Sequence, residues 1–385
     1  MMLPFIDLAA QQRRLKPHID AAIARVLAHG QYVMGPEVAE FERRLAAFCS
    51  APLALSCANG TDALALPLLA WEIGPGDAIF MPSFTFAATA EAVAWTGASP
   101  VFVDIDASTY NLDPRALEGA IAEVRESGDL QARAVIAVDL FGQTADYPAI
   151  AAICERDRLR LISDNAQACG ATLAGRHPIA WADAVATSFF PAKPLGAYGD
   201  GGAVLASDPA LWERMDSLRV HGKATAADAA RGAFAHEAKY LNARVGMNSR
   251  LDTLQAAILL AKLDAFPEEI AARNRAAERY GAALSGRGLC VPEVIAGGVS
   301  TWAQYVIEHD DRDGLAAHLA RQGIPTAVYY PVPMHLQAPY AHHPAPGGLP
   351  VTEDKARRVL ALPMHADLDA QTQDRIVAAI RSYNG

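Results

Sequence analysis

Short apolar runs alternate with amphipathic segments over the first half of the chain. Seven runs have the length and uniform apolarity of buried strands, at 53–56, 78–81, 101–103, 134–139, 159–162, 184–190 and 202–206. Between them, apolar residues recur at helical spacing at 61–71, 87–95, 114–124 and 147–158. Strands that are apolar throughout and alternate with helices predict a mostly parallel sheet with helices on both faces. Such sheets bind ligands at the carboxyl ends of their strands.

The pattern changes after residue 209. A helix is predicted at 211–220, a long functional loop at 221–245, and two helices at 249–266 and 267–284, the second beginning with a proline in its first turn. Beyond 297 the pattern predicts a smaller α+β unit, with strands at 303–308 and 325–329 and helices at 312–322, 352–360 and 370–383. We therefore expect a large domain over 1–265 and a small C-terminal α+β domain over 266–385.

Composition narrows the possible functions. A chain of 385 residues is long enough for about two domains. Its formal net charge of −10 argues against nucleic acid as a partner but leaves anionic small molecules open. The five cysteines show no C-x-x-C spacing and are expected to be reduced thiols. We expect a cytoplasmic protein with no membrane partner, because neither a signal peptide nor an apolar run of about 20 residues is present.

Lys193 is the most informative single residue. It follows the apolar run 184–190 and is surrounded by glycine, proline and small residues. A desolvated lysine is more easily neutral, and a neutral amine can form a Schiff base with an aldehyde. Asp164 ends an earlier predicted strand, and a lysine and an acid on neighbouring strand ends are the two groups that pyridoxal phosphate requires. Taken alone, Lys193 is more often a surface residue and Asp164 a turn former.

Three further segments fit the same cofactor. Phe86 can lie against one face of the cofactor ring. Gly60 and Thr61 stand where a strand turns into a helix, a position at which backbone N–H groups bind phosphate. Ser188, at the end of the strand before Lys193, can donate another hydrogen bond. Each has an ordinary alternative, a core phenylalanine or a helix start, so only their order and spacing together favour a pyridoxal phosphate site. No histidine cluster has metal-ligand spacing, and we expect no metal.

The chain resembles the DegT-type nucleotide-sugar aminotransferases, a branch of the fold-type I pyridoxal-phosphate-dependent enzymes. The likeness covers essentially the whole chain and is carried by the segments 5–8, 30–38, 188–193, 245–252 and by Asp164 with Gln167. It implies an α/β fold of the fold-type I transferases, with a large mostly parallel sheet domain and a smaller C-terminal α+β domain. Some relatives carry histidine at the lysine position and dehydrate sugars, and Lys193 argues against that branch.

The resemblance assigns roles to individual residues. It implies that Lys193 forms the Schiff base and moves the substrate proton, that Asp164 pairs with the pyridine nitrogen, and that Gln167 lies near the phenolic oxygen. Gly60, Thr61 and Ser188 would hold the phosphate, and Asn248 would reach the phosphate of the neighbouring subunit. The resemblance therefore implies a homodimer with shared active sites, formed with the help of the loop 221–250.

The substrate is also suggested by resemblance. Segments 58–64, 189–191, 194–196, 248–252 and 325–328 resemble aminotransferases acting on a UDP-linked 3-keto-N-acetylglucosaminuronate. This implies transamination from L-glutamate, release of 2-oxoglutarate, and a role in lipopolysaccharide or O-antigen assembly. Tyr329 and Asn165 depart from that subgroup, where histidine and alanine are expected. The alternatives are a sister enzyme for dTDP- or GDP-linked 3-keto or 4-keto deoxysugars, and a non-catalytic sugar-binding or regulatory protein.

A substrate with a diphosphate and a carboxylate needs basic partners. The basic residues placed to receive these groups are Arg219, His221, Lys223, Arg244 and Arg250. Arg250 is the preferred partner of the sugar carboxylate because it stands beside Asn248 at the start of a helix. Tyr330 can line the sugar pocket. The alternatives are a solvated charge for each basic residue and a core position for the tyrosine.

Overall fold

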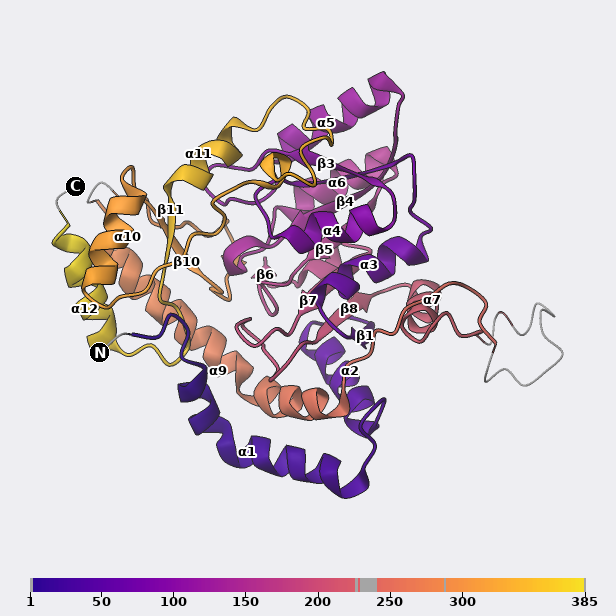
Figure 1. Ribbon diagram of the computed structural model, residues 1–385, viewed down its shortest axis with the longest axis horizontal. Helices are drawn as coiled ribbons and strands as arrows, with labels where there is room; N and C mark the ends of the chain where they lie inside the picture. Colours follow the sequence, from indigo (N-terminus) through magenta and orange to yellow (C-terminus); the bar gives the residue numbers. More distant parts are fainter. Residues whose placement is uncertain (1–2, 226–227, 229–240, 287–288, 384–385) are drawn as a thin grey trace.

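The computed structural model describes residues 3–225, 228, 241–286 and 289–383 (Figure 1). The helices and strands up to residue 219 are α1 (Leu8–His29), α2 (Pro36–Phe48), β1 (Leu53–Cys57), α3 (Gly60–Ala70), β2 (Asp77–Pro82), α4 (Ala87–Trp95), β3 (Ser99–Val103), α5 (Pro114–Ser127), β4 (Gln131–Val138), α6 (Tyr147–Asp157), β5 (Arg160–Asp164), β6 (Thr172–Leu173), β7 (Ala184–Ser188), β8 (Gly202–Ala206) and α7 (Pro209–Arg219). Those from residue 253 are α9 (Thr253–Leu284), β9 (Gly298–Val299), β10 (Tyr305–Glu308), α10 (Arg312–Arg321), α11 (Pro350–Arg358), β11 (Val359–Leu362) and α12 (Ala370–Arg381).

A seven-stranded sheet forms the centre of the large domain, in the order β1-β8-β7-β5-β4-β2-β3. The strand β8 runs antiparallel to both of its neighbours, and the other pairs are parallel. One face packs against α2, α5, α6 and the first part of α9, and the other against α3, α4 and α7. The prediction of a mostly parallel sheet between helical layers is confirmed, and each of the seven predicted strands belongs to this sheet.

Local sequence explains where several helices begin. Asn59 caps α3 by accepting the amide of Asp62 at 2.8 Å. Asp113 and Asp208 cap α5 and α7, each followed by a proline at the first helical position, where its missing N–H costs nothing. These caps fix the points at which the strands of the sheet pass into the covering helices.

The small domain is built on the antiparallel pair β10–β11, covered by α10, α12 and the second half of α9. The structure has one continuous helix at 253–284, where the sequence predicted two. Pro267 lies inside it, since a proline removes only one hydrogen bond and both halves of α9 are buried, one against each domain. In Figure 1 this helix runs from beneath the sheet to the small domain. The predicted boundary at 265/266 thus falls within a helix that both units share.

Other differences are local. The expected strand at 325–329 is reduced to a single bridge between Ala327 and Ala361, because Pro325 has no N–H to donate. The helix expected at 352–360 ends at Arg358 and passes directly into β11. Leu3 packs against the small-domain core although it belongs to the segment assigned to the large domain. Most of the predicted loop at 221–245 lies outside the described residues. Over the described part of the chain, no helix is long and apolar enough to cross a membrane.

Candidate active site at the carboxyl edge of the sheet

Lys193 and Asp164 meet at the carboxyl ends of two neighbouring parallel strands. Asp164 is the last residue of β5 and pairs in register with Ala186 of β7, whose end leads into the segment that carries Lys193. Burial raises the pKa of the Asp164 carboxyl, and hydrogen bonds from Thr89 and Ala166 and the charge of Lys193 oppose that rise. Burial lowers the pKa of the Lys193 amine, and Asp164 opposes that shift. The structure therefore places the predicted amine and acid together, in an environment that favours the neutral amine.

Gln167 joins this centre to the small domain. Its side-chain oxygen accepts the amide N–H of Phe141 at 2.8 Å, and its side-chain nitrogen donates to the Tyr330 hydroxyl at 2.9 Å. The Tyr330 ring lies 6.3 Å, centroid to centroid, from the ring of Phe86. Phe86 is 57% exposed, which removes the alternative of a core phenylalanine. An aromatic face is thus open at the edge of the site, as stacking on a flat cofactor requires.

The predicted phosphate site is a close packing of three backbone segments. A side-chain Cβ at Gly60 would meet the Cβ of Ser188 at 2.7 Å, and one at Gly202 would meet the carbonyl oxygen of Asn59 at 2.2 Å. Gly60 and Thr61 form the first turn of α3, whose free N–H groups point out of the helix end. The glycines therefore bring the Ser188 hydroxyl next to a helix N-terminus, and this donor set suits a phosphate.

The segment around Asn248 and Arg250 lies beside the start of the 221–250 loop. Asn248 forms a bridge with Val220 and is exposed. Arg250 is partly exposed, and among the described residues no carboxylate lies within 4.0 Å of its guanidinium. His221 is exposed, and its backbone is held by Met247 and the Asn242 side chain. These placements leave Asn248, Arg250 and His221 available to ligands.

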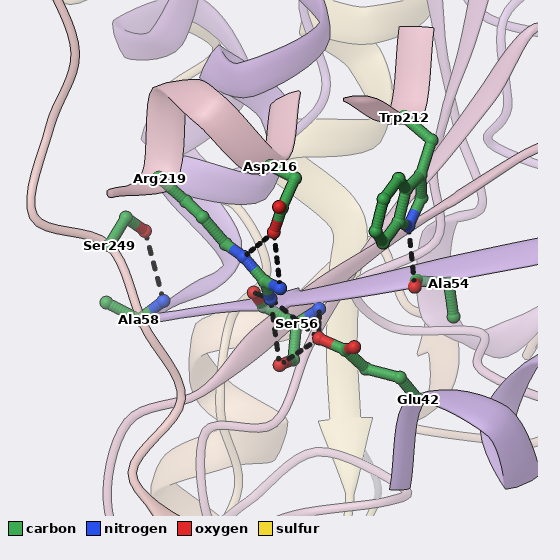
Figure 2. A network of polar contacts seen from close by, with 8 residues as sticks. All are labelled: Glu42, Ala54, Ser56, Ala58, Trp212, Asp216, Arg219 and Ser249. Atoms are coloured by element: carbon green, nitrogen blue, oxygen red, sulfur yellow. Dashed lines mark hydrogen bonds and ion pairs between the residues drawn. The ribbon is translucent and has the colours of Figure 1, made fainter. Parts of the chain in front are cut away.

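Arg219 has a different environment, shown in Figure 2. The Arg219 side chain is only 3% exposed, and its guanidinium donates to Glu42 at 2.6 Å, to the Ser56 carbonyl at 2.6 Å and to Asp216 at 2.8 Å. Because these internal acceptors use its donors, the expectation that Arg219 binds substrate is corrected to a structural role. The sequence does indicate one of these contacts, because Asp216 stands three residues before Arg219 on the same helix, a spacing typical of ion pairs. Arg244, considered with it, is likewise paired internally, with Asp228 at 2.7 Å.

Two residues near the site were not predicted. Thr89, in the first turn of α4, donates to Asp164 at 2.8 Å. Ser249 accepts the amide N–H of Ala58 at 3.1 Å, a bond drawn in Figure 2, and donates to Asp62 at 2.6 Å. Ser249 thus ties the Asn248–Arg250 segment to the start of α3. Neither contact has a local sequence signature, because each joins residues far apart in the chain.

A partly buried amine beside a buried carboxylate, an open aromatic face and a glycine-lined helix start suited to phosphate lie at one sheet edge. Together they define the site of a fold-type I pyridoxal phosphate enzyme. The model of the DegT/DnrJ/EryC1/StrS aminotransferase family matches residues 13–381, and the chain belongs to this family. Its cofactor is pyridoxal phosphate and its activity is that of an aminotransferase, so the predicted family, fold class, enzyme class and cofactor are confirmed.

Individual relatives are similar over their full lengths. The chain is 46% identical, over 98% of its own length and 99% of the relative's, to the UDP-2-acetamido-2-deoxy-3-oxo-D-glucuronate aminotransferase of Pseudomonas aeruginosa. A DegT DnrJ EryC1 StrS aminotransferase from Brucella abortus has a solved structure with a TM-score of 0.95, 49% identity and 100% coverage of both chains. S. venezuelae DesV in complex with a ketimine intermediate gives a TM-score of 0.90 at 38% identity, covering 99% of this chain and 98% of DesV.

Proposed function

We propose that this enzyme transfers an amino group from L-glutamate to a UDP-linked 3-keto-N-acetylglucosaminuronate, yielding the 3-amino sugar nucleotide and 2-oxoglutarate. The product would serve surface-polysaccharide assembly of the lipopolysaccharide or O-antigen kind. The observation that carries the proposal is the 46% identity, across nearly the whole chain, to a relative named for that 3-oxo-glucuronate substrate.

The residues at the sheet edge can perform the steps that this chemistry needs. Bound pyridoxal phosphate supplies an electron sink for the carbon that bears the amino group. Lys193 contributes an amine whose pKa is lowered by burial, so it gives up its proton more readily than an exposed lysine does. Asp164, placed at the end of β5, carries the negative charge that a protonated ring nitrogen needs. Phe86 would cover one ring face, and the turn of Gly60 with Ser188 would bind the phosphate.

Substrate recognition falls to the Asn248–Arg250 segment and to Tyr330. Arg250 has a guanidinium without a carboxylate partner within 4.0 Å among the described residues, so it is free to pair with the sugar carboxylate. Tyr330, fixed by Gln167, would line the sugar pocket, and the exposed His221 would lie on its rim. Asn248 would reach the phosphate of a second subunit, which makes the working unit a homodimer.

The test is a substrate panel with L-glutamate as donor, following 2-oxoglutarate formation. The panel contains the UDP-3-keto-uronate, the matching UDP-3-keto-N-acetylglucosamine without the carboxylate, and dTDP-linked 3-keto and 4-keto deoxysugars. We expect kcat/KM to be highest for the uronate by at least about tenfold, the value of one charged hydrogen bond. Turnover of a deoxysugar with no turnover of the uronate would overturn the proposal in favour of the sister activity.

The donor and the homodimer have separate readouts. Replacing L-glutamate by other amino acids should lower the rate, and light scattering should give twice the 40.9 kDa mass of the chain. A monomer that is fully active would contradict the sharing of active sites.

A further inference from the structure

A buried chain of three oxygen-bearing side chains runs behind the cofactor edge. The Thr89 hydroxyl lies 2.8 Å from one carboxylate oxygen of Asp164, and the Thr85 hydroxyl lies 2.9 Å from that of Thr89. Thr89 is fully buried and Thr85 and Asp164 are nearly so. Thr85 and Thr89 stand on either side of the start of α4, and β5 supplies Asp164, so a helix and a strand are joined at this point.

The chemistry of the three groups fixes the direction of the bonds. An ionised carboxylate only accepts, so Thr89 donates to Asp164. A hydroxyl has one proton, so the oxygen of Thr89 must then accept from Thr85. The bond to the carboxylate is charge-assisted, and the Thr85 bond polarises it further. The other oxygen of Asp164 accepts only the amide N–H of Ala166, at 3.2 Å, among the described residues, and keeps capacity for another donor.

The Thr89 hydrogen bond also acts on the charge of Asp164. Burial raises the pKa of this carboxyl, and among the groups that lower it Thr89 is the largest, ahead of Ala166 and Lys193. Tyr330 and Tyr147 also interact with this carboxyl, which contributes to the raised pKa of each tyrosine. Without the hydroxyl, the pKa of the Asp164 carboxyl would rise further, and its carboxylate would lose the hydrogen bond that fixes its orientation.

We propose that Thr89 is a positioning residue that orients the Asp164 carboxylate toward the ring nitrogen of the cofactor, with Thr85 holding Thr89 in turn. The inference deepens the proposed function and rests on its assignment of Asp164 to that nitrogen. The alternative is that Thr89 only fills space in the core. In that case valine, which has the same shape, would replace it without changing cofactor binding.

The experiment compares Thr89→Val, which keeps the shape and loses the hydroxyl, with Thr89→Ser, which keeps the hydroxyl. The Kd of pyridoxal phosphate is measured on apoprotein, with the visible absorbance of the bound cofactor as a function of pH and the thermal midpoint of the apoprotein. We expect Thr89→Val to raise the Kd by about tenfold to a hundredfold and to shift the pH midpoint of the absorbance. Thr89→Ser should stay within about threefold of the parent, and Thr85→Val should fall between them.

A double-mutant cycle with Asp164→Asn decides how the residue acts. If Thr89 works through the carboxylate, Thr89→Val should add little to the loss already caused by Asp164→Asn. An unchanged Kd and pH midpoint in Thr89→Val, equal losses in Thr89→Val and Thr89→Ser, or additive losses in the cycle would each overturn the inference. Parent-like cofactor binding by Asp164→Asn would instead refute the assignment of Asp164 itself, which separates the two failures.

Discussion

Two regions of the molecule bury charged side chains, and they do so in opposite ways. Around Arg219, internal acceptors take the hydrogen bonds of the guanidinium, which donates to Glu42, to Asp216 and to the Ser56 carbonyl. At the sheet edge, Lys193 is placed near Asp164, yet across the described residues no ion pair within 4.0 Å and no side-chain hydrogen bond engages its amine. A buried charged group whose hydrogen bonds are all made within the protein has a structural role, whereas one that lacks an internal partner can bind a ligand.

Lys262 and Lys193 allow the same comparison between two lysines whose pKa is lowered by burial. Lys262 is only 1% exposed, donates to the Gly196 carbonyl at 2.7 Å and lies 4.3 Å from the centre of the Tyr198 ring. Burial lowers its pKa to about 8, and burial also lowers that of Lys193. A pKa lowered by burial is thus common to both lysines. The fixed partner of Lys262 distinguishes it from Lys193, the lysine that we propose to be catalytic.

The largest effect is expected from Lys193→Ala. Loss of the amine that we propose to form the Schiff base should lower kcat by about 10⁴-fold or more, as removal of a covalent catalyst does. The visible absorbance of the bound cofactor should change with it. Lys262→Met is the control, because it removes a second amine whose pKa is lowered by burial, and its kcat should stay within about tenfold of the parent. Equal losses in the two variants would contradict the distinction between them.

The second effect concerns stability. Arg219→Met removes the cation that pairs with the partly buried Glu42 carboxylate and leaves that carboxylate only its hydrogen bonds from Ser56. The free energy of unfolding should fall by about 3 kcal/mol in a urea titration. The folded fraction should still bind pyridoxal phosphate with an unchanged Kd. Pairing Arg219→Met with Glu42→Gln should recover part of the loss. A stable variant with weakened substrate binding would restore the substrate role that the structure argues against.

The third effect separates substrate from fold at Arg250. Arg250→Ala should reduce kcat/KM for the uronate substrate by about tenfold to a hundredfold, the value of a hydrogen bond to a charged group. It should leave kcat/KM for the carboxylate-free analogue and the thermal midpoint unchanged. Equal losses on both sugars would assign Arg250 to the nucleotide or to the fold.

The smallest effect is the pH dependence of stability at Lys262. Its pKa is about 8 in the folded chain and 10.5 ordinarily, so between these values the unfolded chain holds more protons. This contribution therefore makes the apoprotein more stable as pH rises, by up to about 1.4 kcal/mol per pH unit. Unfolding at pH 7 and at pH 9.5 should show this gain in the parent and a smaller one in Lys262→Met. An equal gain in the free energy of unfolding in the parent and in Lys262→Met would show that a group other than Lys262 causes the pH dependence.

The sequence predicted what depends on local pattern. The seven strands could be predicted because each is apolar throughout. Lys193, Asp164 and Gly60 could be placed at one edge of the sheet because the carboxyl ends of parallel strands converge there, and their roles stay a prediction. The continuity of α9 through Pro267 was missed, since it depends on burial of both halves against different domains.

The role of Arg219 and the contact of Thr89 with Asp164 were missed for a related reason. Arg219 and Glu42 are separated by 177 positions, and Thr89 and Asp164 by 75. Local sequence patterns cannot predict a contact between side chains so far apart in the chain. The partners that distinguish a structural charged residue from a functional one are therefore seen only in the folded structure.

Whether Lys193 binds the cofactor covalently can be measured by locating the attachment site. The purified enzyme is loaded with pyridoxal phosphate, reduced with borohydride, digested, and mapped by mass spectrometry. We expect the phosphopyridoxyl mass on Lys193 and none on Lys262. Attachment to Lys262, or an unmodified Lys193 in enzyme that turns over, would contradict this expectation.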